Sequence, residues 1–91
     1  MKAVLFRAHG GPDNLSYEDL PTPSIGSEDV LVRVKACALN HLDIWIREGN
    51  PAYPIPLPHV LGSDVAGIVE QVGAQVDIVT VGQRVVVAPG I

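Results

Sequence analysis

Proline and glycine interrupt this chain so often that it can form only short elements of secondary structure. The 91 residues include eight prolines and nine glycines. Proline removes a backbone donor and fixes φ, and glycine favours turns. Four of the prolines fall within residues 50–59 (NPAYPIPLPH), which predicts a stiff, extended loop. Valine is the commonest apolar residue, and together with the frequent prolines and glycines it favours short strands joined by turns.

The length allows one domain at most, and the composition limits what that domain binds. The net charge is −4 and the basic residues are scattered, which gives no electrostatic footprint for nucleic acid. No apolar run approaches the ~20 residues that a membrane span needs, and no signal peptide begins at Lys2. The single cysteine, Cys37, excludes an internal disulfide and fits a reducing compartment. We therefore expect a soluble, cytoplasmic, β-rich protein.

β-prone runs between turn signals predict five strands, at Met1–Arg7, Leu15–Leu20, Val30–Ala38, Val65–Val72 and Arg84–Ala88. Val30–Ala38 is the clearest of them. Its alternation assigns one face to Val30, Val32, Val34 and Ala36, and the other to Leu31, Arg33, Lys35 and Cys37. The chain stops just after the last predicted strand, so we expect a truncated domain.

The periodicity changes in residues 40–48 (NHLDIWIRE), where apolar residues recur at helical spacing, at Leu42, Trp45 and Ile46. Asn40 suits the N-cap, Asp43 suits the first turn and Gly49 suits the C-terminal stop. These residues predict a helix of about two turns. Because Trp45 shares a helical face with Leu42, we expect it to lie in the core.

Three sequence blocks occur in order, at Val30–Asp43, Gly62–Gly73 and Val81–Val87. Together they resemble the N-terminal domain of the medium-chain dehydrogenase/reductase superfamily, which includes alcohol dehydrogenases and quinone oxidoreductases. Separate motifs in the expected order confirm one another. The resemblance implies that residues 1–91 form a mainly β, GroES-like, partly open barrel with one short helix. No glycine fingerprint for a pyrophosphate occurs, so the Rossmann domain of such a protein is absent.

Two positions depart from the zinc alcohol dehydrogenases of that superfamily. Those enzymes place a cysteine where Asn40 stands and a His-Glu pair where Ser63-Asp64 stands. Catalytic zinc needs about three protein ligands, and amide and hydroxyl groups are poor ones. Leu42 also replaces the hydroxyl that commonly relays protons. We therefore expect no zinc at the catalytic position.

The same residues resemble the zinc-free quinone oxidoreductases and related enoyl reductases. That branch uses NADPH, held mainly by the missing domain, to deliver a hydride to a quinone, enone or related conjugated carbonyl. The resemblance implies catalytic roles for Asn40, Asp43 and Tyr53. It also implies a substrate and cofactor cleft at His41, Trp45, Ser63 and Asp64. We expect a small-molecule substrate and a homodimeric full-length enzyme, with no turnover by residues 1–91 alone.

Simpler interpretations remain open for several of these residues. Asn40 and Asp43 are also explained as a helix cap and its first-turn acid. Tyr53 could anchor the proline-rich loop, and turn hydrogen bonding would explain Ser63 and Asp64. A rival set of zinc ligand types also exists: Cys37, His41, His59 and Asp64.

Two alternative functions follow from these interpretations. The first is a zinc-dependent alcohol dehydrogenase with unusual ligands. The second, from a different class, is a stand-alone co-chaperonin-like binding module, since fold alone is a weak guide to function. The substrate, and NADPH rather than NADH, are set by residues outside this chain.

Overall fold

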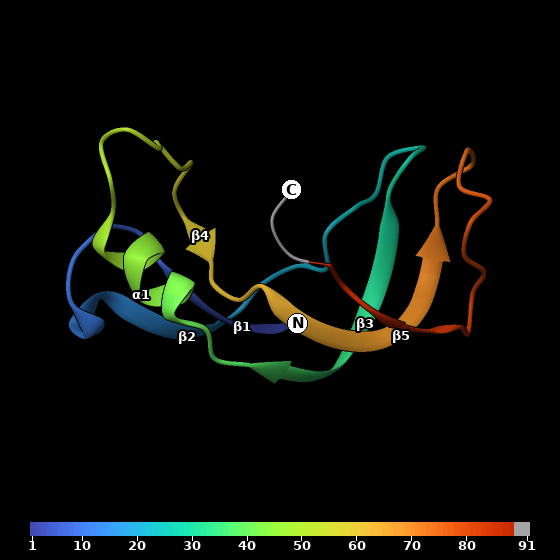
Figure 1. Ribbon diagram of the computed structural model, residues 1–91, viewed down its shortest axis with the longest axis horizontal. Helices are drawn as coiled ribbons and strands as arrows, with labels where there is room; N and C mark the ends of the chain where they lie inside the picture. Colours follow the sequence, from blue (N-terminus) through green and yellow to red (C-terminus); the bar gives the residue numbers. More distant parts are fainter. Residues whose placement is uncertain (89–91) are drawn as a thin grey trace. The chain divides into compact units, whose positions relative to one another are not determined.

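The computed structural model describes residues 1–88 (Figure 1). It consists mostly of strands, with a single α-helix and one 3-10 turn among the described residues. The elements in chain order are β1 (Lys2–Phe6), a 3-10 turn (Pro12–Asn14), β2 (Leu15–Asp19), β3 (Val30–Ala38), α1 (His41–Glu48), β4 (His59–Val60), β5 (Asp64–Val72) and β6 (Arg84–Val86). The mainly β class and all five predicted strands are confirmed. The last strand is two residues shorter at its C-terminal end than predicted, and β5 starts one residue earlier.

The chain divides into two compact units, and each is described by itself. The first comprises residues 1–21 and 39–62. Its antiparallel sheet has the order β2-β1-β4, with β1 in the centre. Leu5 and Phe6, at the end of β1, are fully buried and form the core of this unit. Residues 50–58 contain neither helix nor strand, as the four prolines predict. The loop predicted to reach residue 59 ends one residue earlier, because His59 begins β4, which was not among the predicted strands.

Helix α1 is anchored at its C-terminal end by the loop that follows β1. The backbone N–H of Gly10 donates to the carbonyl of Arg47 at 2.9 Å, and Nε of Arg47 donates to the carbonyl of Gly10 at 3.1 Å. The ring of His9 also lies within hydrogen-bond distance of the Ile46 carbonyl, at 3.1 Å. Because the last carbonyls of a helix lack intrahelical partners, these contacts satisfy them and hold the helix on the sheet.

The second unit comprises residues 22–38 together with residues 63–88. Its antiparallel sheet has the order β3-β5-β6, and the long strands β3 and β5 make most of its contacts. Val69 on β5 is almost completely buried at 1% exposure. Gly67 also has to be glycine, since a Cβ there would lie 2.2 Å from the carbonyl oxygen of Arg33.

The predicted strict alternation along β3 is wrong. The register with β5 shifts twice, between Leu31 and Val32 and between Val34 and Ala36. The second shift leaves Lys35 as an extra residue without a partner on β5. A bulge of this kind interrupts the alternation. Ala36, opposite Ala66, therefore lies on the same face as Arg33, opposite Ile68, and not on the face of Val34.

Only three apolar side chains of residues 1–88 are fully buried, namely Leu5, Phe6 and Val69. Many large apolar side chains are exposed, among them Leu39 at 97%, Ile78 at 86% and Val86 at 81%. No helix within residues 1–88 has the length and apolar character needed to cross a membrane.

Candidate functional site

The N-terminus of α1 is closed by a reciprocal pair of hydrogen bonds between Asn40 and Asp43. The Oδ1 atom of Asn40 accepts from the backbone N–H of Leu42 at 2.9 Å. The Oδ2 atom of Asp43 accepts from the backbone N–H of Asn40 at 3.1 Å. This is a capping box, in which two of the unpaired donors of the first turn are satisfied by side chains. The capping interpretation of both residues is therefore confirmed.

The second carboxylate oxygen of Asp43 is the one unsatisfied acceptor of this helix start. Oδ1 is buried and has no hydrogen-bond partner within the described chain. A carboxylate accepts hydrogen bonds only, and the positive end of the helix dipole stabilises its charge. Leaving such an oxygen buried without a donor costs free energy. The first turn of α1 thus holds a buried carboxylate oxygen for which the described residues supply no donor.

The exposed side of α1 carries an aromatic pair. The rings of His41 and Trp45, one helical turn apart, meet edge to face with 4.8 Å between their centroids. Trp45 is 59% exposed, so its predicted place in the core is wrong. Helical spacing identifies the face on which a residue lies, but tertiary contacts decide whether that face is covered.

Tyr53 lies in a turn of the proline-rich loop. Its backbone N–H donates to the carbonyl of Asn50 at 2.9 Å, and the Oδ1 atom of Asn50 accepts from the N–H of Ala52 at 2.9 Å. The side chain of Tyr53 is 72% exposed. The loop is therefore shaped by Asn50, and the tyrosine ring does not anchor it by packing.

Ser63 and Asp64 lie in the other unit, at the beginning of β5. Asp64 is half-buried and is opposite Ala38 in the strand register. The hydroxyl oxygen of Ser63 is buried, and the described residues supply no hydrogen-bond partner for it. Turn hydrogen bonding therefore does not account for the Ser63 side chain.

The four rival zinc ligand types divide between the two units, with His41 and His59 in the first and Cys37 and Asp64 in the second. Within residues 1–88, no group of three or more histidine, cysteine, aspartate or glutamate side chains is arranged to hold a metal ion. Cys37 is exposed and is opposite Val65 in the strand register. His59 is half-buried and packs edge-on against Phe6, with 5.7 Å between the ring centroids. His59 thus has a structural explanation within its own unit.

The sequence predictions missed the contribution of His9. Its ring packs on Phe6 at 5.3 Å between centroids and reaches the Ile46 carbonyl. A Cβ on Gly49, which ends α1 with a φ of +87°, would lie 2.7 Å from Cγ of His9. His9 therefore sets how closely the end of α1 approaches the first unit's core. Two residues 40 positions apart carry no local signal for such a contact.

Comparison with known proteins identifies relatives along nearly the whole chain. The family model for the alcohol dehydrogenase GroES-like domain matches residues 26–90. A quinone oxidoreductase of Pseudomonas aeruginosa is 44% identical over 90 residues, which cover 98% of this chain and 27% of that protein. The chain spans about a quarter of the length of the curated relatives it matches.

Solved structures give the same result. The Escherichia coli quinone oxidoreductase complexed with NADPH matches with a TM-score of 0.88 at 36% identity, over 100% of this chain and 28% of that chain. An NAD-dependent alcohol dehydrogenase matches with a TM-score of 0.83 at 51% identity, over 94% of this chain and 25% of that chain. Both the quinone oxidoreductase and the alcohol dehydrogenase interpretations thus have structural counterparts.

Proposed function

Because this chain belongs to the alcohol dehydrogenase GroES-like domain family of the medium-chain dehydrogenase/reductase superfamily, we propose that it is the substrate-side domain of a longer NAD(P)H-dependent oxidoreductase. The membership also establishes the GroES-like fold predicted from the sequence. No glycine fingerprint for a pyrophosphate occurs in residues 1–91. The nucleotide would therefore be held mainly by a Rossmann domain elsewhere in the longer protein.

We propose that the longer protein transfers a hydride to a quinone, enone or related conjugated carbonyl without zinc. The observation that carries this proposal is the hydrogen bond that the Asn40 side chain accepts at the start of α1. At the position that resembles the zinc cysteine, this chain has a carboxamide whose Oδ1 already accepts the Leu42 N–H. A carboxamide engaged as a helix cap does not fit a tetrahedral zinc site, which requires thiolate, imidazole or carboxylate ligands. Ser63, where the zinc histidine would stand, offers only a hydroxyl.

NADPH, when bound, would supply the hydride, and the residues of this chain would position the substrate oxygen. The capping bond to Oδ1 fixes the plane of the Asn40 carboxamide, and therefore the direction of its Nδ2 donor. A preorganised donor stabilises the negative charge that develops on a carbonyl oxygen during reduction. The hydroxyl of Tyr53 would be a second donor. The Oδ1 atom of Asp43 would accept from a hydroxyl of the substrate or cofactor.

His41, Trp45, Ser63 and Asp64 would complete the cleft in the longer protein. The exposed Trp45 ring suits contact with a planar conjugated substrate. We further propose an NADPH-using homodimer in the cytoplasm, where a lone cysteine stays reduced. The substrate within the conjugated carbonyl class is set by residues outside this chain.

Metal analysis of the longer protein, followed by assays with and without a chelator, tests the zinc-free reaction. We expect less than stoichiometric zinc at the Asn40 position, and reduction of a quinone or enone by NADPH that a chelator leaves unchanged. Stoichiometric zinc that is lost together with activity would instead establish the alternative, a zinc alcohol dehydrogenase. The 51% identity to an NAD-dependent alcohol dehydrogenase makes this the stronger of the two alternatives.

The chain alone provides a separate test of its role as one domain. Residues 1–91 should show no turnover and should bind NADPH weakly or not at all, because the pyrophosphate site is missing. Tight binding of NADPH in calorimetry would contradict the proposal that another domain holds the nucleotide. Sedimentation of residues 1–91 as a defined ring would favour the co-chaperonin-like alternative.

A further inference from the structure

The six basic side chains of this protein divide into two groups. Four of them are paired with carboxylates, in the pairs Lys2–Asp19, Arg7–Glu18, Arg33–Glu70 and Arg47–Glu48. The other two, Lys35 and Arg84, have no ion-pair partner within the described chain. Acidic residues outnumber basic ones by ten to six, so partners are plentiful. Both unpaired cations nevertheless lie in the second unit and line the same hollow.

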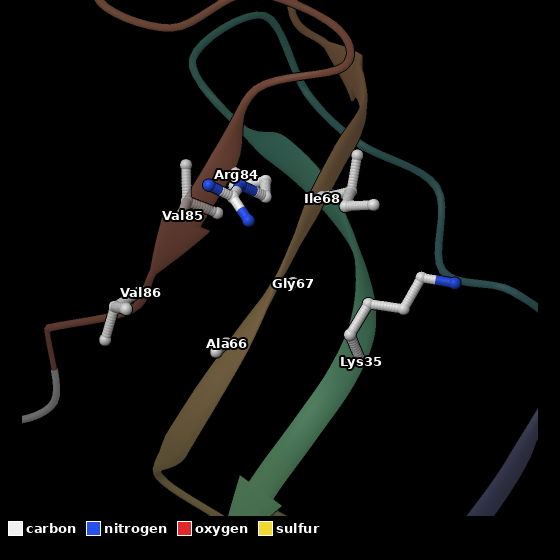
Figure 2. A pocket seen from close by; sticks show the side chains of 7 residues that line it. All are labelled: Lys35, Ala66, Gly67, Ile68, Arg84, Val85 and Val86. Atoms are coloured by element: carbon white, nitrogen blue, oxygen red, sulfur yellow. The ribbon is translucent and has the colours of Figure 1, made fainter.

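The hollow has a volume of about 390 Å³ and lies over three strands, β3, β5 and β6 (Figure 2). We call it the Lys35–Arg84 hollow. Its lining contains no acidic side chain, and consists of Lys35, Ala66, Gly67, Ile68, Arg84, Val85 and Val86. The hollow is open to solvent, and Val86 in its lining is 81% exposed. This hollow has an apolar floor with two cations at its sides.

The strand register explains why the two cations share one hollow. Arg84 on β6 is opposite Ile68, and Val86 is opposite Ala66, so these four side chains lie on one face of the sheet. Arg33 on β3 is also opposite Ile68, so alternation along the strand places Lys35, two residues later, on this same face. Figure 2 shows Lys35 and Arg84 on opposite sides of β5, with Ala66 and Gly67 between them.

In Figure 2 the Lys35 side chain extends away from Arg84, so holding one anionic group together requires it to turn back over β5. They lie on strands that are both neighbours of β5, so their backbones are separated by two strand spacings, about 9.6 Å. Lysine and arginine side chains are long and flexible enough to converge across that width. A guanidinium offers planar, bidentate hydrogen bonds to a phosphate, and an ammonium adds a point charge. The small side chain of Ala66 leaves the space above the floor open.

We propose that the Lys35–Arg84 hollow binds the dianionic phosphate of a small phosphomonoester whose apolar body lies on Ala66, Ile68 and Val86. The two positive charges match the charge of a phosphomonoester better than that of a single carboxylate. The apolar floor gives a ligand with a hydrophobic body an advantage over free phosphate. This site is separate from the proposed hydride transfer, and neither proposal requires the other.

Phenyl phosphate is a suitable probe, observed by phosphorus NMR as it is titrated with the longer protein already saturated with NADPH. The nucleotide site is then filled, so that added phosphate does not report on it. We expect saturable broadening of the phenyl phosphate resonance. Inorganic phosphate should compete, but more weakly, because it lacks the apolar body. Binding should strengthen from about pH 5.5 to about pH 7.5, as the phosphomonoester loses its second proton near pH 6.

Substitutions separate a specific site from general attraction to positive charge. Lys35→Gln and Arg84→Gln should each weaken binding about tenfold, since charge-assisted hydrogen bonds are roughly twice as strong as neutral ones. The control is Lys2→Gln, which removes an exposed cation that is paired with Asp19 at 2.6 Å. This control should bind phenyl phosphate as the unsubstituted protein does.

Several results would overturn the proposal. One is the absence of saturable binding, and another is equal weakening by Lys2→Gln, which would indicate nonspecific electrostatics. Benzoate binding as tightly as phenyl phosphate would contradict the dianionic class. Displacement of the probe by an acidic peptide but not by inorganic phosphate would indicate a protein partner instead. Because turnover is not measured, none of these results bears on the proposed reductase activity.

Discussion

The Oδ2 atom of Asp43 accepts a hydrogen bond from the backbone N–H of Asn40 at 3.1 Å, while the Asn40 side chain caps the same helix. The two residues thus fix each other at the start of α1. Any substrate role for Asn40 is combined with a structural one. A substitution that removes both roles together, such as Asn40→Ala, does not distinguish them.

Asn40→Ser keeps a helix cap and removes the carboxamide. Serine is as good an N-cap as asparagine, so the free energy of unfolding should stay close to that of the unsubstituted protein. The turnover of the longer protein should fall about a hundredfold, as when one donor to a developing oxyanion is removed. Urea unfolding and steady-state kinetics measure the two effects.

The matched comparison is Asn40→Ala, which should lower the free energy of unfolding by about 1 kcal/mol in addition to lowering turnover. If Asn40→Ser keeps full turnover, Asn40 is a helix cap only. The proposed donor to the substrate oxygen would then have to be another residue, such as Tyr53.

Stability at acid pH should depend on Glu18. A hydrogen bond from Arg7, and to a smaller extent one from Ser16, lowers the pKa of Glu18 to about 2. In the unfolded chain this carboxyl has its usual pKa of about 4.3. The folded pKa is the lower one, so the stabilisation is present above the unfolded value and is lost as pH falls toward about 2.

We therefore expect unfolding in urea to become easier below about pH 4.3, and less so for Glu18→Gln than for the unsubstituted protein. Glu18→Gln cannot take up the proton, so the difference between the two urea midpoints should shrink as pH is lowered. A difference that is constant with pH would show that the Arg7–Glu18 pair contributes nothing through its charge.

Gly67→Ala should strongly destabilise the second unit. A Cβ at this position would lie 2.2 Å from the carbonyl oxygen of Arg33 and 2.7 Å from Cγ1 of Val32. Backbone atoms of a paired strand cannot move away cheaply, so we expect a loss of about 3 kcal/mol or failure to fold, at the upper end of overpacking effects. Unfolding in urea or a soluble-expression assay would show it.

Gly11→Ala is the matched control. No atom lies within 4 Å of a Cβ built at Gly11, and its φ of −78° suits any residue. The free energy of unfolding of the Gly11→Ala variant should be unchanged or slightly raised. Equal destabilisation by both substitutions would mean that the close approach at Gly67 is not the cause.

The start and end of α1 could be predicted from the sequence because both depend on residues three or four positions apart. The N-cap, the first-turn acid and the glycine stop are all found as predicted. The bulge at Lys35 could not be predicted in the same way. It depends on the register between β3 and β5, which are separated by the helix and the proline-rich loop. The Lys35–Arg84 hollow follows from that register, so no local pattern indicates it.

The exposure of Trp45 was also missed, because burial depends on which surface covers a helix face rather than on the periodicity of that face. The same limit applies to the unsatisfied oxygens of Asp43 and Ser63. Residue type identifies them as polar groups suited to a site. Only the three-dimensional structure shows that no protein group within residues 1–88 satisfies them.

Trp45→Ala should lower the free energy of unfolding far less than truncation of a buried residue of the first unit. Trp45 is 59% exposed, whereas Leu5 is 0% exposed. Truncating a buried leucine typically costs about 2–5 kcal/mol. We expect Leu5→Ala to lose an amount in that range, and Trp45→Ala to lose less than about 1 kcal/mol.

Fluorescence gives an independent check, since Trp45 is the only tryptophan in residues 1–91. Its emission in this chain should resemble that of indole in water and should be quenched readily by acrylamide. If the longer protein instead shows shielded emission that phenyl-substituted enones or quinones alter, Trp45 lies in the cleft, as the proposed function requires. Shielding in residues 1–91 alone, together with a stability loss as large as that of Leu5→Ala, would restore the original core assignment.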